Sequence, residues 1–385
     1  MGSIAAGCLA SHKRQSIAFP SLMFLARSGL VLLVLSMALV PSTSYSAEIF
    51  EKVGSVGAQF LTIEPDPRGE ALGGAYSALA DGPSGVHWNP AGLGFSSGVE
   101  FADQRHIADP IDWFASLDVS FRAASVSLRT LADGLPLGTL CLWQGRTDVE
   151  PLVEPLYAPA AFRQEEATYE PDVWEDAIGI SYGHRVIPSL SLGATYKRIR
   201  SKFGASEATG NGFDFGAAFC QGMPINEQAE LGVGAAAGIR NLGSLGPYGS
   251  SGASWDLPRQ AYLSIAPSLH VGHLWDWIAE ATVSAELAYD DPEEEWIRMA
   301  GIELTVLSGL SARYGTYHKD SSERRNSSGW GLAARYRDIV GLSLDYSTTE
   351  FELLGDVERY MLRLAVINCR RGIDVRQVID AIQQR

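Results

Sequence analysis

Residues 277–289 read WIAEATVSAELAY, and this stretch decides the fold. Every second residue from Trp277 to Tyr289 is apolar, while Glu280 and Glu286 lie among the residues between them. A period of two is typical of a β-strand with one apolar face. Twelve steps of about 3.3 Å span about 40 Å. Tilted by about 45°, such a strand covers the apolar band and aromatic girdles of an outer-membrane barrel.

The same alternation recurs through the rest of the chain. Soluble sandwiches also alternate, but their strands are usually only about 5–6 residues long. Long strands with terminal aromatic residues therefore favour an all-β fold, a transmembrane antiparallel β-barrel of about 14 strands over residues 98–368. The predicted girdle residues are Trp277, Tyr289, Trp296 and Trp330, and the predicted lumen-facing residues are Glu280, Glu286, Glu303, Arg335 and Arg363.

Connections of two lengths are expected between these strands. Short links at 187–189 and 338–340 predict periplasmic turns. Longer acidic stretches at 147–174, 242–257 and 319–327 predict outward loops. Asp290, Asp291, Glu293, Glu294 and Glu295 cluster without the glycine of a calcium-binding turn, so we expect a solvated loop there.

The first segment, residues 1–47, predicts a secretory signal peptide. Positive residues precede the apolar run LVLLVLSMALV at 30–40, and small residues follow Pro41. No later apolar run reaches the length of about 18 residues that a membrane helix needs. The formal charge of −15 opposes binding to nucleic acid. The chain is therefore expected to be exported to the bacterial outer membrane and to contact membrane lipid there.

Residues 54–94 form a glycine-rich, irregular stretch ahead of the strands. Irregular backbone is tolerated at membrane depth only where protein or water surrounds it, so residues 48–97 are expected to form a plug or hatch inside the barrel. Asn89-Pro90-Ala91-Gly92 predicts a tight turn into the first strand. Asp81 is expected either to cap a short helix or to pair with a lumen arginine such as Arg335 or Arg363.

The same stretch resembles the PorV/PorQ family, which is itself similar to the FadL-type transporters of hydrophobic compounds. The resemblance is carried by a GAxFL element at 57–61, an arginine ahead of a GGA run, an ALAD element at 78–81 and a WNPAG element at 88–92. The hatch residues that it marks are Arg68, Gly73, Gly74, Asp81, Trp88, Asn89, Pro90 and Gly92.

Two functions follow from this resemblance. Similarity to PorV implies a binding or shuttle component for exported proteins of a type IX-like secretion pathway, with secretion-system subunits as partners. Similarity to FadL implies the alternative, a passive transporter of hydrophobic small molecules across the outer membrane. The PorV-like motifs match more closely, so the protein-binding role is placed first.

No chemistry of catalysis is evident in the sequence. It contains no nucleophile elbow and no dinucleotide-binding or zinc-ligand spacing, so we expect neither an enzyme nor a metal or other cofactor. Residues 369–385 carry apolar side chains at helical spacing from Val375 to Ile382, which predicts a periplasmic helical tail.

Overall fold

The computed structural model describes residues 56–108, 115–131, 137–151, 173–226, 228–249, 252–274, 277–307, 309–320, 323–336, 339–351 and 355–366. The predicted signal peptide, residues 48–55 and the predicted tail at 369–385 lie outside these ranges. Among the helices of the described residues, none combines the length and the apolar character needed to cross a membrane.

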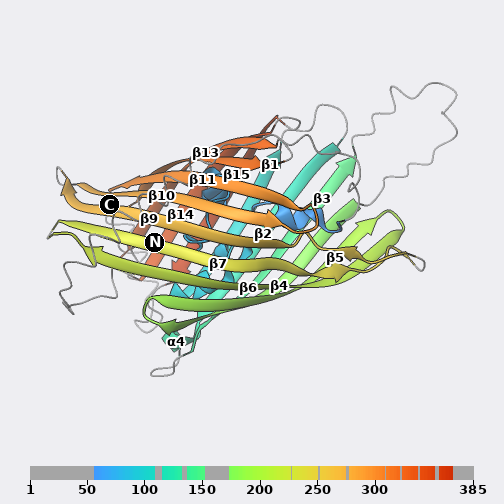
Figure 1. Cartoon of the computed structure of the whole chain (residues 1–385), viewed down its shortest axis with the longest axis horizontal. Coiled ribbons are helices and arrows are strands. Elements are labelled where there is room, and N and C mark those ends of the chain that lie inside the picture. Colours follow the sequence, from blue (N-terminus) through green and yellow to red (C-terminus); the bar gives the residue numbers. More distant parts are fainter. Residues whose placement is uncertain are drawn as a thin grey trace, which may run out of the picture.

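The strands of the described chain form a single sheet (Figure 1). They are β1 Val99–Ala108, β2 Ala115–Ser127, β3 Thr139–Pro151, β4 Val173–Ile187, β5 Leu190–Phe203, β6 Ser206–Pro224, β7 Ala229–Leu245, β8 Trp255–Asp256, β9 Gln260–Leu274, β10 Trp277–Asp290, β11 Glu295–Val306, β12 Leu310–Lys319, β13 Arg324–Tyr336, β14 Val340–Phe351 and β15 Gly355–Val366. Of these 15 strands only β8 is as short as two residues, which leaves the 14 long strands that the alternation predicts.

The sheet closes on itself as an antiparallel barrel. Neighbours along the chain pair with one another from β1 to β7 and from β9 to β15, β7 pairs with β9, and β1 pairs with β15. The pairing of β1 with β15 runs from Val99–Val366 to Ala108–Val357 without interruption. Closure leaves no long edge exposed, so the predicted fold class is confirmed.

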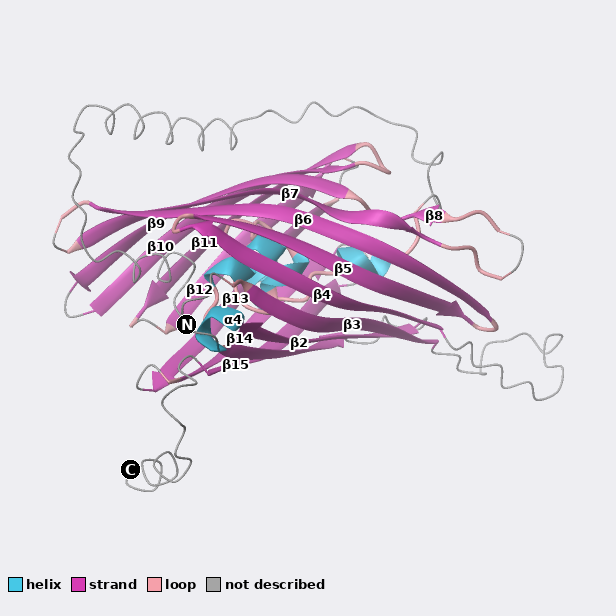
Figure 2. Ribbon diagram, turned by 90° about the horizontal axis from the view of Figure 1, so that it is seen from below, coloured by secondary structure: helices cyan, strands magenta, loops and turns pink. Residues whose placement is uncertain are grey.

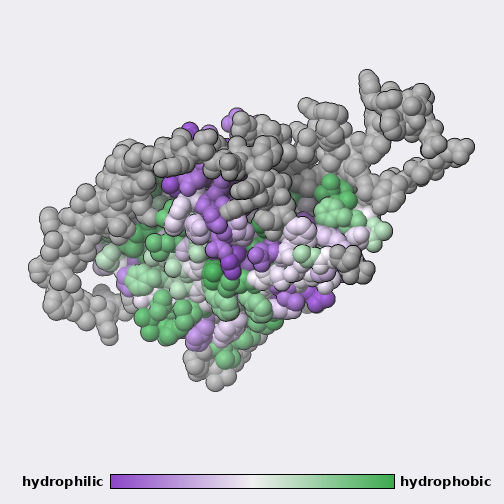
Figure 3. Space-filling view, turned by 45° about the vertical axis from the view of Figure 1, so that its right-hand side comes forward, coloured by the Kyte–Doolittle hydropathy of each residue, from purple (hydrophilic) through white to green (hydrophobic). Residues whose placement is uncertain are grey.

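Side chains alternate between the lumen and the outside along each strand. On β10, Thr282, Ser284 and Glu286 are almost fully buried, whereas Val283 is 42% exposed. The surface view shows hydrophobic areas on the described wall beside hydrophilic patches (Figure 3). An apolar outer face with a polar inner one suits a wall that has lipid outside and protein or water inside.

The connections confirm one prediction and correct another. Residues 188–189 alone link β4 to β5, as the sequence suggests. We call this end of the barrel the short-link end and the other the long-loop end. At the long-loop end the strands reach farther than predicted: β3 extends to Pro151, β7 extends to Leu245 and β13 starts at Arg324. Parts of the predicted loops at 147–174, 242–257 and 319–327 are therefore strand. The backbone ladder continues through the polar residues there, as in the β3–β4 pairs from Thr147–Glu175 to Val149–Val173.

Residues that pair across neighbouring strands form rows around the barrel. Because the strands are tilted, each row shifts steadily toward one end of the barrel as it passes from strand to strand. The row that starts at Ala279, near the short-link end of β10, continues from strand to strand until Ser244 and Asp256 at the long-loop end of β7 and β8. A residue on β1–β5 thus lies nearer to the long loops than its row partner on β12–β15.

Residues 56–97, called the inner segment below, lie within the barrel (Figure 2). Its elements are η1 Gln59–Thr62, α3 Pro67–Ala71, η2 Gly85–His87 and η3 Pro90–Phe95, and the remaining helix α4 Leu128–Leu131 follows β2. Asp66 caps α3 by accepting a hydrogen bond from the Arg68 backbone N–H at 2.9 Å, with Pro67 at the first helical position. The predicted turn is present, since Asn89 caps η3 in the same way.

Candidate functional site

The inner segment is held to one side of the wall by buried ion pairs. Arg68 donates to both carboxylate oxygens of Glu303 on β11 at 2.8 Å. Arg313 on β12 contacts the same carboxylate at 2.6 Å and Asp345 on β14 at 2.8 Å. Two-pronged arginine–carboxylate pairs fix orientation as well as distance. The arrangement therefore locks α3 against β11–β14.

Arg363 on β15 forms a second group of contacts with the inner segment. Its guanidinium donates to Asp81 and to Asp66 at 2.9 Å each, and to the Ser84 hydroxyl at 2.7 Å. Arg68 also lies 3.4 Å from Asp81. Of the two lumen arginines predicted as partners of Asp81, the structure brings Arg363 to it, while Arg335 is exposed near the short-link end of β13.

The pKa of Asp81 reflects this pairing. Burial alone would raise it, but the guanidinium groups of Arg363 and Arg68 outweigh burial and lower the pKa below its ordinary value of 3.8. Asp81 is therefore charged near neutral pH and holds both arginines.

Two more carboxylates connect the inner segment to the wall. Glu286 on β10 accepts from the Ser77 backbone N–H at 2.9 Å and from the Ser77 hydroxyl at 2.8 Å, and it pairs with Arg240 at 3.1 Å. Glu70 of α3 accepts from Ser347 at 2.5 Å and is paired with Arg359. The predicted lumen positions Glu286, Glu303 and Arg363 thus all contact the inner segment, whereas Glu280 is half-buried.

The inner segment also packs closely by backbone contact, on β5 and on β12. A Cβ added to Gly193 on β5 would lie 2.3 Å from the Ala91 backbone nitrogen, and one added to Gly315 on β12 would lie 2.1 Å from that of Gly73. Gly73 and Gly74 both have positive φ, at 65° and 84°. The motif residues Trp88, Asn89, Pro90 and Gly92 are buried between these walls. The predicted interior position of this stretch is what the structure shows for residues 56–97.

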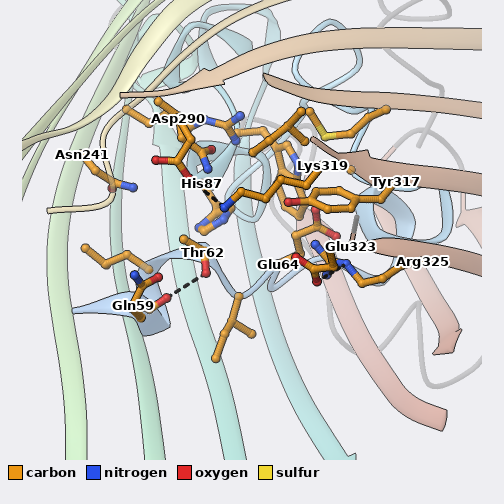
Figure 4. Close-up of a pocket in the computed structure, with 18 of the residues that line it drawn as sticks. Gln59, Thr62, Glu64, His87, Asn241, Asp290, Tyr317, Lys319, Glu323 and Arg325 are labelled. Atoms are coloured by element: carbon orange, nitrogen blue, oxygen red, sulfur yellow. Dashed lines mark hydrogen bonds and ion pairs between the residues drawn. The ribbon is translucent and has the colours of Figure 1, made fainter. Parts of the chain in front are cut away.

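A cavity of about 520 Å³ lies between the inner segment and the long-loop ends of the strands (Figure 4). Apolar side chains of the inner segment and of β11, β14 and β15 line part of it: Leu61, Ile63, Trp88, Ile297, Met299, Phe351 and Val357. Its volume is in the range of about 300–1,000 Å³ that small-molecule sites occupy. We call it the vestibule.

Polar residues line the rest of the vestibule and are paired with one another. Lys319 contacts Asp290 at 3.5 Å and is also bound to Glu293. Arg325 lies 3.8 Å from the centre of the Tyr317 ring. Asp290, expected in a solvated loop, is instead 4% exposed, because it ends β10 and Lys319 covers it. No group of metal ligands is found among the described residues.

Three of the four residues predicted for an aromatic girdle have described side chains. The Tyr289 and Trp296 rings lie 5.0 Å apart, and Trp296 and Trp330 are 44% and 39% exposed. The side chain of Trp277 lies outside the part that the structure describes. The vestibule itself was not predicted, because its lining comes from strands far apart in the sequence and shows no local motif.

The described chain is thus a closed antiparallel β-barrel with residues 56–97 inside. No family profile matches it, and no curated protein matches it in sequence. It is similar in fold to a Pseudomonas aeruginosa FadL homologue, at 12% identity over 79% of this chain and 98% of that chain with a TM-score of 0.40. The Ralstonia pickettii toluene transporter TbuX matches at 11% identity over the same shares with a TM-score of 0.40. At these values the likeness assigns neither a family nor a function.

Proposed function

We propose that the protein is a bacterial outer-membrane barrel that gives hydrophobic small molecules a passive route, with the vestibule as the entry site. The observation that carries this proposal is the vestibule, a cavity of about 520 Å³ on the long-loop side of the inner segment. In outer-membrane barrels the longer loops face outward, so a ligand would reach this cavity from outside the cell.

The lining of the vestibule supports a ligand with an apolar body. Leu61, Ile297 and Met299 are buried apolar side chains that line it. Lys319 is already bound to carboxylates. A ligand with an apolar body would bury apolar surface on binding, and each Å² buried contributes about 25 cal/mol to the binding free energy.

The protein-binding role that resemblance to PorV implies ranks second. It needs a docking surface for exported proteins. The vestibule, by contrast, is a described cavity of small-molecule size.

A cavity-filling variant tests the first proposal. Met299→Trp on β11 should occupy part of the vestibule and weaken binding of toluene and decanoate by about tenfold, equal to about 1.4 kcal/mol, in equilibrium dialysis. Leu304→Trp, which places the same ring on the outer face of the same strand, should leave binding unchanged. Equal binding by the native protein and both variants, or no binding by the native protein, would contradict the proposal.

A further inference from the structure

Five arginines face outward on neighbouring strands near β1: Arg105 on β1, Arg122 on β2, Arg146 on β3, and Arg198 and Arg200 on β5. Arg105 and Arg122 are 56% and 60% exposed at their side chains. Their strand neighbours Gln104 and Phe121 are buried in the lumen. Alternation therefore places these arginines on the lipid side of the wall.

Register gathers the five arginines into two adjacent rows. One row runs Arg105–Ser120–Arg146–Asp176–Arg200, and the next runs Asp103–Arg122–Gln144–Ile178–Arg198. On the other side of β1, the second row continues through Leu362, Leu344, Leu332 and Leu310. Because rows climb toward the long loops from β12 to β5, the leucines lie nearer to the short-link ends of their strands and the arginines nearer to the long-loop ends.

The row directly below the arginines is apolar. It consists of Phe101, Ala124, Leu142, Ile180, Tyr196 and Phe213. Phe101 is 47% and Leu142 58% exposed. A shallow hollow of about 510 Å³ opens on the outer wall here, and both kinds of residue line it: Phe101, Leu142 and Leu362 with Asp103 and Arg122. The hollow thus joins an apolar floor to a charged upper rim.

The outward aspartates use only part of the arginine donors. Arg122 donates through Nε to Asp103 at 3.0 Å, and Arg105 lies 3.7 Å from the same carboxylate. Arg146 is paired with Asp148, and Arg200 with Asp176. The two rows still hold five arginines against two aspartates, in a chain of formal charge −15. The next row toward the long loops carries three acids, Asp118, Asp148 and Glu207, against one cation, Lys202, and its net negative charge would repel an anion.

We propose that this surface binds an anionic lipid of the outer leaflet, with the lipid phosphate on Arg105, Arg122 and Arg146 and an acyl chain in the hollow. Arginine is suited to this role because its planar fork matches phosphate oxygens and is always charged. The apolar floor selects a membrane lipid rather than free phosphate. A charge left facing hydrocarbon is costly, so a bound headgroup also explains how the wall tolerates these residues. The proposal is independent of what enters the vestibule.

Lipid retention by the detergent-purified full-length barrel tests the proposal, with phosphatidylglycerol and phosphatidylcholine as probes and native mass spectrometry as the readout. The native protein should retain phosphatidylglycerol in clear preference. Arg105→Gln with Arg122→Gln should weaken that retention by about tenfold or more, since each removes charge-assisted hydrogen bonds. Asp103→Asn, which removes a competing carboxylate, should strengthen it.

A matched control removes two outward arginines elsewhere. Arg298→Gln with Arg324→Gln, on β11 and β13, should leave retention unchanged. Equal retention of the two lipids, or an equal loss in both double variants, would overturn the proposal. A third result would also overturn it: the native protein is a dimer, the Arg105/Arg122 variant alone is a monomer, and lipid retention is the same in both. The surface would then bind a second copy of the chain.

Discussion

Gly92 shows how tightly single residues fit inside the barrel. A Cβ at this position would lie 2.1 Å from the Ala80 carbonyl oxygen, within the inner segment itself. Overpacking at a buried site typically costs about 1–3 kcal/mol. We therefore expect Gly92→Ala to loosen the inner segment while the strands stay paired, measured as faster amide hydrogen exchange over residues 57–97.

Gly272 on β9 offers the comparison for that change. A Cβ there meets only the Gln228 carbonyl oxygen at 3.6 Å, an ordinary contact distance. Gly272→Ala should leave exchange in the inner segment unaltered. Similar exchange in both variants would mean that the close approach at Gly92 is relieved at little cost.

At the residue scale, the sequence narrows the partner of Asp81 to two arginines but does not distinguish between them. Alternation marks Arg335 and Arg363 as equally lumen-facing, yet only Arg363 lies deep enough on its strand to meet Asp81 and Asp66 together. Depth follows from barrel tilt and register, which single strands do not encode. Glu303 and Glu286 were likewise predicted to face the lumen, but their partners Arg68 and Ser77 are more than 200 residues away.

At the scale of elements, the inner segment is attached in two different ways. Charged side chains join it to β10–β15, where Gly315 of β12 also approaches its backbone closely, whereas η3 packs on the glycine-containing strands β4 and β5. Removing one partner of a buried ion pair leaves the other charge uncompensated and costs about 3–5 kcal/mol. The ionic side is therefore where a single substitution should free the inner segment.

Arg363→Gln tests this asymmetry, because it leaves Asp66 and Asp81 without their shared guanidinium. We expect larger single-channel conductance in planar bilayers. The barrel should still be folded, which its heat-modifiable mobility on gels would show. Arg335→Gln, at the exposed end of β13, should conduct like the native protein. Unchanged conductance in Arg363→Gln would show that the remaining ion pairs and the close backbone contacts keep the segment seated without Arg363.

At the scale of the whole molecule, strand length and alternation were enough to predict a closed barrel of 14 long strands. They were not enough to place charges around it. Arg105, Arg122 and Arg198 each sit in an ordinary alternating strand, and only the climbing register joins them on one surface. The vestibule has the same origin, since β7 and β9–β15 meet there by closure of the barrel.

The seating of the inner segment should depend on pH in a defined direction. Burial, together with the positive charges of Arg240 and Lys197, holds the pKa of His87 well below its ordinary value of 6.5. In a released segment His87 would regain that value. As pH falls below about 6.5 the released form takes up a proton that the seated form does not, so seating loses stability. Asp81, with its lowered pKa, adds a second loss only below about 3.8.

Conductance measured from pH 8 downward should therefore be constant until about 6.5, rise gradually below it and rise further below about 3.8. His87→Gln cannot be protonated in this range, so it should abolish the first rise and keep the second. Asp81→Asn should do the reverse, on a higher baseline because Arg363 loses a partner. Conductance that increases as pH is raised would contradict the sign of both effects, and an unaltered first rise in His87→Gln would remove His87 from the seating of the segment.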